Sequence, residues 1–95
     1  MSKVRRPIRV PKNREAKLRY GIYYYRYADE NLMRQDTSGS TNVLENAFGR
    51  AADHCARSEL NEREYAMALI IDRWQGRMLR SYTKRGHSIQ IKEYM

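Results

Sequence analysis

Apolar side chains recur at helical spacing in three stretches of this chain, and each stretch predicts a helix. In residues 14–34 the apolar positions lie three or four residues apart: Leu18, Ile22, Tyr25, Ala28 and Leu32. Asn13 directly before this stretch is a good N-cap. The segment GIYYYRYA within it would also suit a strand, because it contains four tyrosines and an isoleucine, and Gly21 interrupts the helix.

A second helix follows the polar loop DTSGSTN, residues 36–42, with Thr41 or Asn42 as its N-cap. One face of this helix is apolar and carries Val43, Leu44, Ala47, Phe48, Ala51, Ala52 and Cys55. Cys55 continues that face, so we expect a buried structural thiol rather than a nucleophile.

A third helix is predicted from a cap at Ser58 or Asn61 to Lys84 or Arg85, with Gly86 as the residue that ends it. Glu59, Glu62 and Glu64 would lie near its start, where acidic side chains are stabilised by the helix dipole. Its apolar side would carry Met67, Ile70, Ile71, Trp74, Met78, Leu79 and Tyr82. If Gly76 breaks this helix, the second half becomes a short basic helix in a poorly fitting helix-turn-helix arrangement.

The two ends of the chain complete the predicted fold. Pro7 and Pro11 prevent a regular helix, so residues 1–12 are expected to form an extended arm. SIQIKEY, residues 88–94, alternates apolar and polar positions and suits a short strand or a loosely docked tail, and it could pair with IRV at residues 8–10. The prediction is a mainly α, three-helix single domain over residues 13–95, with a basic arm and a possible two-stranded β pair between the termini.

Charge suggests the class of partner. Nineteen Lys and Arg against eleven Asp and Glu give a net charge of +8. Residues 1–20 and 63–95 are both basic, whereas the stretch between them is slightly acidic. A strongly basic small domain attracts polyanions at long range.

The candidate phosphate-binding residues fall in two groups, the arm and one stripe of the third helix. Arg73, Arg77, Arg80 and Lys84 would share one helix face, because they are spaced by four, three and four residues. The full predicted set is Arg5, Arg6, Arg9, Lys12, Arg14, Arg73, Arg77, Arg80, Lys84 and Arg85. Tyr23 and Tyr27 are the tyrosines expected to be exposed and to stack on bases.

Catalytic and metal-binding motifs are weak. His54 and Cys55 are adjacent, which points their side chains about 100° apart on a helix and separates a thiolate from its base. Two histidines and one cysteine are too few for a typical zinc site, so neither a metal nor another cofactor is expected. His87 follows Gly86 in a probable turn, and we expect a solvated side chain there.

These patterns together favour a non-enzymatic nucleic-acid-binding protein, without separating DNA from RNA. The leading alternative is a small inhibitor or adaptor that docks its basic face on an acidic protein surface. A third possibility is a structural protein of a particle, with the arm tied to an enclosed genome. The lone cysteine fits a reducing, cytoplasmic compartment, and no apolar run approaches the ~20 residues that span a bilayer, so no membrane partner is expected.

Overall fold

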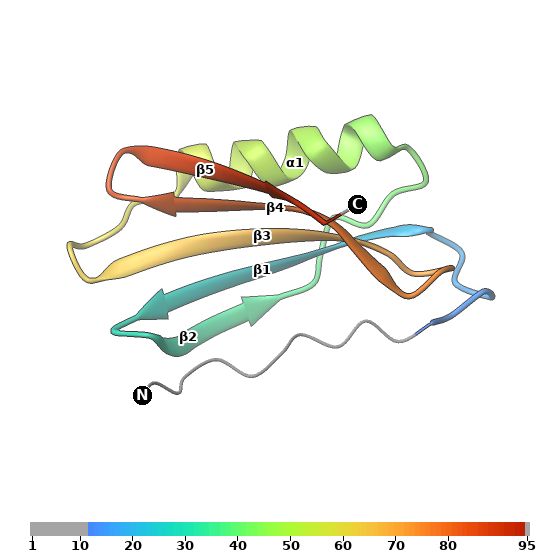
Figure 1. Cartoon of the computed structure of the whole chain (residues 1–95), viewed down its shortest axis with the longest axis horizontal. Helices are drawn as coiled ribbons and strands as arrows, with labels where there is room; N and C mark the ends of the chain where they lie inside the picture. The colour runs from blue at the N-terminus through green and yellow to red at the C-terminus, as the bar shows by residue number, and fades with distance from the viewer. Residues whose placement is uncertain (1–11, 95) are drawn as a thin grey trace.

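Residues 12–94 form one five-stranded antiparallel sheet with a single helix packed on one face (Figure 1). The computed structural model describes residues 12–94, so the predicted arm and its pairing through residues 8–10 lie outside the described residues. The strands run in the order β2-β1-β3-β4-β5 across the sheet. The elements are β1 Tyr20–Ala28, β2 Asn31–Asp36, α1 Leu44–Arg57, β3 Glu64–Asp72, β4 Arg77–Arg85 and β5 Ser88–Glu93.

The prediction of a mainly helical, three-helix domain is therefore wrong. The first expected helix is the β1–β2 hairpin, and the third is the β3–β4 hairpin. All nine residues of β3 are buried, and the seven from Tyr65 to Ile71 form an unbroken apolar run rather than an alternating pattern. Such a run contains apolar residues at every helical spacing as well, so periodicity alone cannot identify it as a strand.

Tight turns connect β1 to β2 and β4 to β5, in segments where the sequence predicted a helix or the end of one. Asp29 and Glu30 both have positive φ, at 52° and 68°, between the paired residues Ala28 and Asn31. This is the backbone of a type I′ turn, whose twist matches that of the flanking strands. Gly86 has a φ of 58° in the two-residue turn between β4 and β5, where a helix end was expected. His87 lies in the same turn, as predicted.

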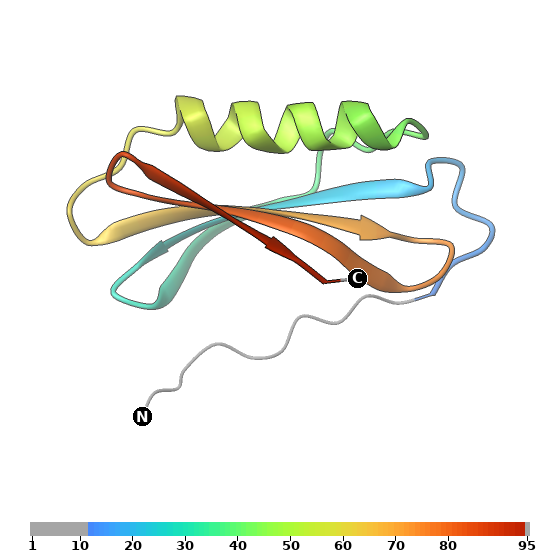
Figure 2. The same cartoon turned by 45° about the horizontal axis from the view of Figure 1, so that its top comes forward.

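The second predicted helix is confirmed as α1, although its cap differs from the prediction. The N-cap residue is Val43, which makes no side-chain capping bond. The Val43 N–H instead donates to Thr41 Oγ1 at 3.1 Å, so Thr41 fixes the residue before the helix rather than the helix itself. Figure 2 shows α1 lying across one face of the sheet.

The core on the helix side confirms the prediction for Cys55. Its thiol is fully buried and lies 3.5 Å from the carbonyl oxygen of Tyr82. Ala47 and Ala51 let α1 approach the sheet closely, because their side chains are small. The strand residues that complete this core are Ile22, Ala68, Ile70, Leu79 and Tyr82.

Tyrosines form much of the opposite face of the sheet. Tyr27 stacks on Tyr65, with ring centroids 4.8 Å apart, and Tyr25 stacks on Tyr27. Tyr27 is only 5% exposed, so its expected exposure was wrong, whereas Tyr23 is partly buried at the edge of this cluster. The other buried members are Met67, Leu69 and Ile71. Within residues 12–94 no helix lies over this face.

Glu64 has a different place in the fold from the predicted one. Glu64 was expected in the first turn of a helix but begins β3, where its carboxylate accepts a 2.7 Å hydrogen bond from Arg26 Nε. Its side chain therefore joins β3 to β1 instead of stabilising a helix dipole. In the part of the chain that the structure describes, no helix is long and apolar enough to cross a membrane.

Candidate nucleic-acid interface

The predicted basic stripe is not a helix face, because its residues lie on a turn and a strand. Arg73 lies in the turn between β3 and β4, and Arg77 is exposed at the start of β4. Arg80 and Lys84 belong to the side of β4 that faces α1, since they pair with Ile70 and Ala66. A spacing of four, three and four places residues on one face of a helix, whereas side chains alternate between the two faces of a strand.

Arg80 is held by groups within the fold. Its guanidinium forms an ion pair with Glu93 on β5, with an Nη2–Oε2 distance of 2.7 Å. It also lies over the ring of Phe48, 3.8 Å from the centroid, and donates to the hydroxyl of Tyr82. The hydrogen bonds to Glu93 and Tyr82 raise the pKa of Arg80 further. Arg80 therefore ties β4, β5 and α1 together.

Lys84 and Arg85 also have partners in the fold. The ammonium of Lys84 donates to the carbonyl oxygens of Ser58 and Ala56, at 2.7 and 3.3 Å. These carbonyls belong to the end of α1, where a helix leaves acceptors unpaired and a cation is stabilised. Arg85 lies over the ring of Tyr65 at 3.9 Å. Arg5, Arg6 and Arg9 lie outside the described residues.

The remaining predicted cations meet at the turn between β3 and β4. This turn is built around Asp72, whose carboxylate accepts the backbone N–H groups of Trp74 and Gln75 at 3.1 and 3.3 Å. The same carboxylate accepts two side-chain N–H groups of Arg19, and the hydrogen bond to Arg19 lowers the pKa of Asp72. Asp72 is 3% exposed, so its charge is satisfied inside the fold and is not part of the surface.

The segment before β1 runs alongside this turn and brings further basic residues to it. The backbone N–H of Asn13 donates to the carbonyl of Arg73 at 2.7 Å, and the indole N–H of Trp74 donates to the carbonyl of Ala16 at 2.7 Å. Gly76 has a φ of 66°, and a Cβ there would lie 3.0 Å from backbone atoms of Lys12. Glycine at this position lets the two segments touch.

We call the resulting patch the basic turn surface, and it consists of Lys12, Arg14, Arg73, Trp74 and Arg77. No carboxylate within residues 12–94 forms an ion pair with its four cations. Trp74 is 36% exposed, and the guanidinium of Arg19 lies 5.2 Å from the centre of its ring. A shallow hollow of about 620 Å³ opens here, lined by Lys12, Arg14, Arg19, Trp74 and Gln75.

This arrangement combines two kinds of contact. Lysine and arginine side chains bind phosphate groups, and an exposed aromatic ring gives a platform on which an unpaired base can stack. The sequence predicts Lys12, Arg14, Arg73 and Arg77 as phosphate-binding residues, whereas Trp74 was assigned to a core face. The signal that could have revealed it is DRWQG, in which Asp and Gly are turn residues on both sides of the tryptophan.

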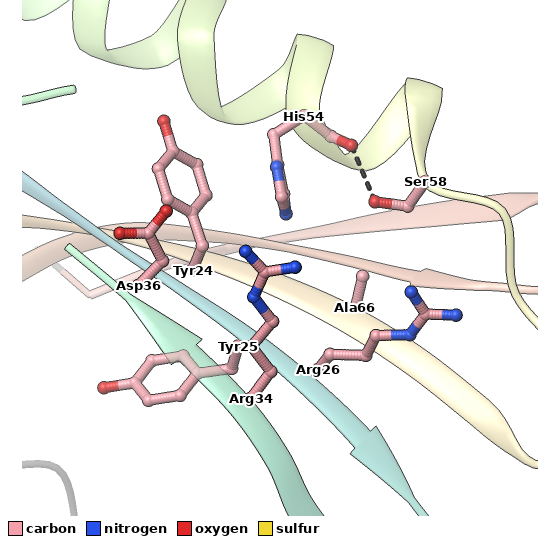
Figure 3. A pocket seen from close by; sticks show the side chains of 8 residues that line it. All are labelled: Tyr24, Tyr25, Arg26, Arg34, Asp36, His54, Ser58 and Ala66. Atoms are coloured by element: carbon pink, nitrogen blue, oxygen red, sulfur yellow. Dashed lines mark hydrogen bonds between the residues drawn. The ribbon is translucent and has the colours of Figure 1, made fainter. Parts of the chain in front are cut away.

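A second hollow lies between α1 and the β1–β2 hairpin (Figure 3). It is a cavity of about 130 Å³ in which the guanidinium of Arg34 points from β2 toward His54 on α1. The rings of His54 and Tyr24 lie 4.2 Å apart. Burial lowers the pKa of His54, and Arg34 acts in the same direction, whereas Asp36 and Asp53 oppose it.

This cavity suits a nucleic-acid strand less well than the basic turn surface. The carboxylate of Asp36 lines it, and it lies below the last turns of α1, where the helix dipole places partial negative charge. Arg26, which also lines it, is already paired with Glu64. The basic turn surface is therefore the better candidate for a polyanion.

Comparison of the chain with models of known protein families, with curated proteins and with solved structures finds no match.

Proposed function

We propose that this protein binds nucleic acid without acting as an enzyme, and that the basic turn surface makes the contact. The observation that carries the proposal is the exposed Trp74, which lines one hollow together with Lys12 and Arg14, two cations that have no carboxylate partner in residues 12–94. In the same part of the chain, Arg80 and Lys84 are engaged inside the fold. Unpaired cations around an exposed aromatic ring favour a ligand that has both phosphates and flat rings.

Each member of the surface has a role in this proposal. Lys12, Arg14, Arg73 and Arg77 contact phosphates, and their attraction is long-ranged and independent of base sequence. Trp74 stacks on one base, which favours single-stranded nucleic acid because bases in a duplex already stack on one another. The chain preceding Lys12 contains Arg5, Arg6 and Arg9, whose charge would add to the attraction.

Trp74 is the only tryptophan of the chain, so its fluorescence reports on this surface directly. We expect titration with a single-stranded oligonucleotide of 12 nucleotides to quench this fluorescence, with a smaller effect for a duplex of the same length. The logarithm of the affinity should fall with the logarithm of the salt concentration with a slope near −3, from about 0.7 for each of four phosphates on a single strand. A slope shallower than −1 would contradict phosphate binding.

A charge reversal with a matched control tests the location. Arg14→Glu combined with Arg77→Glu should weaken binding at least tenfold, as measured by fluorescence anisotropy of a labelled oligonucleotide. The control combines Arg57→Glu with Arg63→Glu, which changes the net charge equally at two side chains that are each 81% exposed. We expect the control to weaken binding less than threefold. Equal losses in both variants would mean that a diffuse positive charge, and not this surface, binds the nucleic acid.

The other partner class considered for this chain, an acidic protein surface, gives a different outcome in the same assay. An acidic polypeptide such as polyglutamate offers charge without rings. If polyglutamate competes with the oligonucleotide at equal charge concentration, and Trp74→Ala leaves the oligonucleotide affinity unchanged, the adaptor function replaces nucleic-acid binding.

A further inference from the structure

Among residues 12–94 no strand pairs with the outer edge of β5, and this strand carries apolar side chains. In residues 12–94 the only strand paired with β5 is β4, and all six residues of β5 are exposed. Ile91 is 59% exposed and Ile89 is 40% exposed. An exposed edge strand with apolar residues is a template on which another strand can pair.

The register of the β4–β5 hairpin determines which backbone groups face outward. Arg85 and Ser88 flank a two-residue turn, so they form its first hydrogen-bonded pair, and this type of pair recurs at every second residue. The N–H of Tyr94 fits this pattern, because it donates to the carbonyl of Leu79 on β4. The N–H and C=O groups of Ile89, Ile91 and Glu93 therefore point away from the sheet.

We propose that two copies of the chain pair through their β5 strands, antiparallel and around a twofold axis at Gln90. In this register Ile89 of one copy lies opposite Ile91 of the other, and the same pair recurs on the far side of the axis. Both residues have outward-facing backbone groups, so the two strands form complete hydrogen-bonded pairs. The four isoleucine side chains then meet on the face of the sheet that carries α1, because they pair with Lys84 and Tyr82 on that face.

Charge supports this register. Lys92 lies opposite Ser88, and Glu93 lies opposite His87, so no two like charges face each other across the interface. Moving the axis to Ile91 would place Glu93 opposite Ile89 and leave the isoleucine pairs incomplete. Cross-strand apolar pairs stabilise a sheet, whereas a charge opposite an apolar residue does not.

The other edge of the sheet is less suitable. β2 also exposes two apolar residues, Leu32 at 51% and Met33 at 60%. Its pairing with β1, however, is irregular between Arg26 and Tyr27, where one residue of β2 is left without a partner. Such an irregularity twists an edge strand and discourages pairing with a further strand. Met33 therefore provides a control position of similar exposure.

The test uses the full chain and measures its mass in solution by sedimentation equilibrium between 5 and 200 µM, as an order-of-magnitude range around the affinities of weak dimers. We expect a monomer–dimer equilibrium for the unmodified chain. Ile91→Lys should shift this equilibrium at least tenfold toward the monomer while circular dichroism retains the β-sheet signal. Met33→Lys should leave the equilibrium unchanged. A chain that stays monomeric over the whole range, or a dimer that only Met33→Lys dissociates, would overturn the proposal.

The register has its own measurement. In the proposed dimer, Gln90 of one copy lies opposite Gln90 of the other. These two residues make no backbone hydrogen bonds to each other, and the Cα atoms of such a pair lie about 4.5 Å apart. Gln90→Cys should therefore form an intermolecular disulfide under mild oxidation, whereas Met33→Cys should not. Cys55 does not interfere because it is fully buried. A dimer in which Gln90→Cys fails to cross-link while Lys92→Cys does would replace this register by another.

Discussion

Asp72 and Arg19 form an ion pair, with an Nη2–Oδ2 distance of 2.8 Å, that joins the end of β3 to the residue before β1. The carboxylate also accepts two backbone N–H groups of the turn that carries Trp74. One buried acid thus fixes both the position of the turn and the path of the segment that brings Lys12 to it. The basic turn surface therefore depends on Asp72, although Asp72 is buried and is not part of that surface.

Removing this carboxylate should destabilise the fold. Asp72→Ala leaves the guanidinium of Arg19 and the N–H groups of Trp74 and Gln75 without their acceptor. Breaking a buried ion pair typically costs 3–5 kcal/mol, and we expect about 3 kcal/mol because Arg19 is partly exposed. Urea denaturation measures the loss. An equally stable Asp72→Ala variant would contradict the structural role of this pair.

The lowered pKa values of Asp72 and Glu93 predict that the stability of the fold depends on pH. The pKa of Asp72 is lowered in the folded protein by its hydrogen bond with Arg19, and that of Glu93 is lowered by its hydrogen bonds with Arg80. Their contribution is complete above their unfolded pKa values, near 4, and is lost as the pH falls through the lower folded values. The melting temperature should therefore fall below about pH 4, and it should fall less steeply in Asp72→Asn.

Gly76 and Gly49 should respond in opposite directions to alanine. Gly76 has a φ of 66° and lies against the backbone of Lys12, so Gly76→Ala should destabilise the fold by about 1–2 kcal/mol. Gly49 lies within α1, where an added Cβ meets no atom within 4 Å, so Gly49→Ala should stabilise it by about 0.5–1 kcal/mol. Thermal melting of both variants checks the signs. A destabilising Gly49→Ala would show that the exposed side of α1 is packed.

Cys55 should react slowly with thiol reagents in the native state. Burial raises the pKa of the thiol to about 11, so the thiolate is scarce at neutral pH. Labelling should become fast only where urea unfolds the chain. A labelling rate in buffer equal to the rate in urea would show that α1 opens readily from the sheet.

Lys84→Met should destabilise α1 through its last turn. The variant keeps the apolar part of the side chain but loses the donor to Ser58 and Ala56, for an expected cost of about 1 kcal/mol. Lys17→Met, at an exposed position before β1, is the control and should change stability by less than about 0.5 kcal/mol. Similar costs for the two variants would mean that the helix end is satisfied by water instead.

The sequence predicted α1 and β5 because their patterns are one-sided. Ala47, Ala51 and Cys55 lie on one face of α1, and its other side is polar, so the period of the helix is visible. In β5, Ile89 and Ile91 alternate with polar residues, as in a strand at the surface. Cys55 was assigned correctly for the same reason, since it extends a face that must be buried.

The other strands were misread because tertiary contacts hide their period. Both faces of β3 are buried, so Ala68 and Leu69 are equally apolar although they point in opposite directions. Residues far apart in sequence surround this strand, and one sequence does not reveal them. The cations of the basic turn surface were predicted from their charge alone. Trp74 could be placed beside them only by recognising that residues 73–76 form a turn. The type I′ turn at Asp29 and Glu30 is unusual in lacking glycine, which removed its usual signal.

The order of the strands has a kinetic consequence. Three of the four strand pairs in residues 12–94 are hairpins between neighbours in sequence, and such hairpins form within microseconds. The fourth, between β1 and β3, pairs Ala28 with Glu64 and Tyr20 with Asp72, across the whole β2–α1 segment. Closing this long loop costs chain entropy before any of its contacts form. We expect folding to be limited by this one step, in which two locally formed halves of the sheet join and α1 gains its surface.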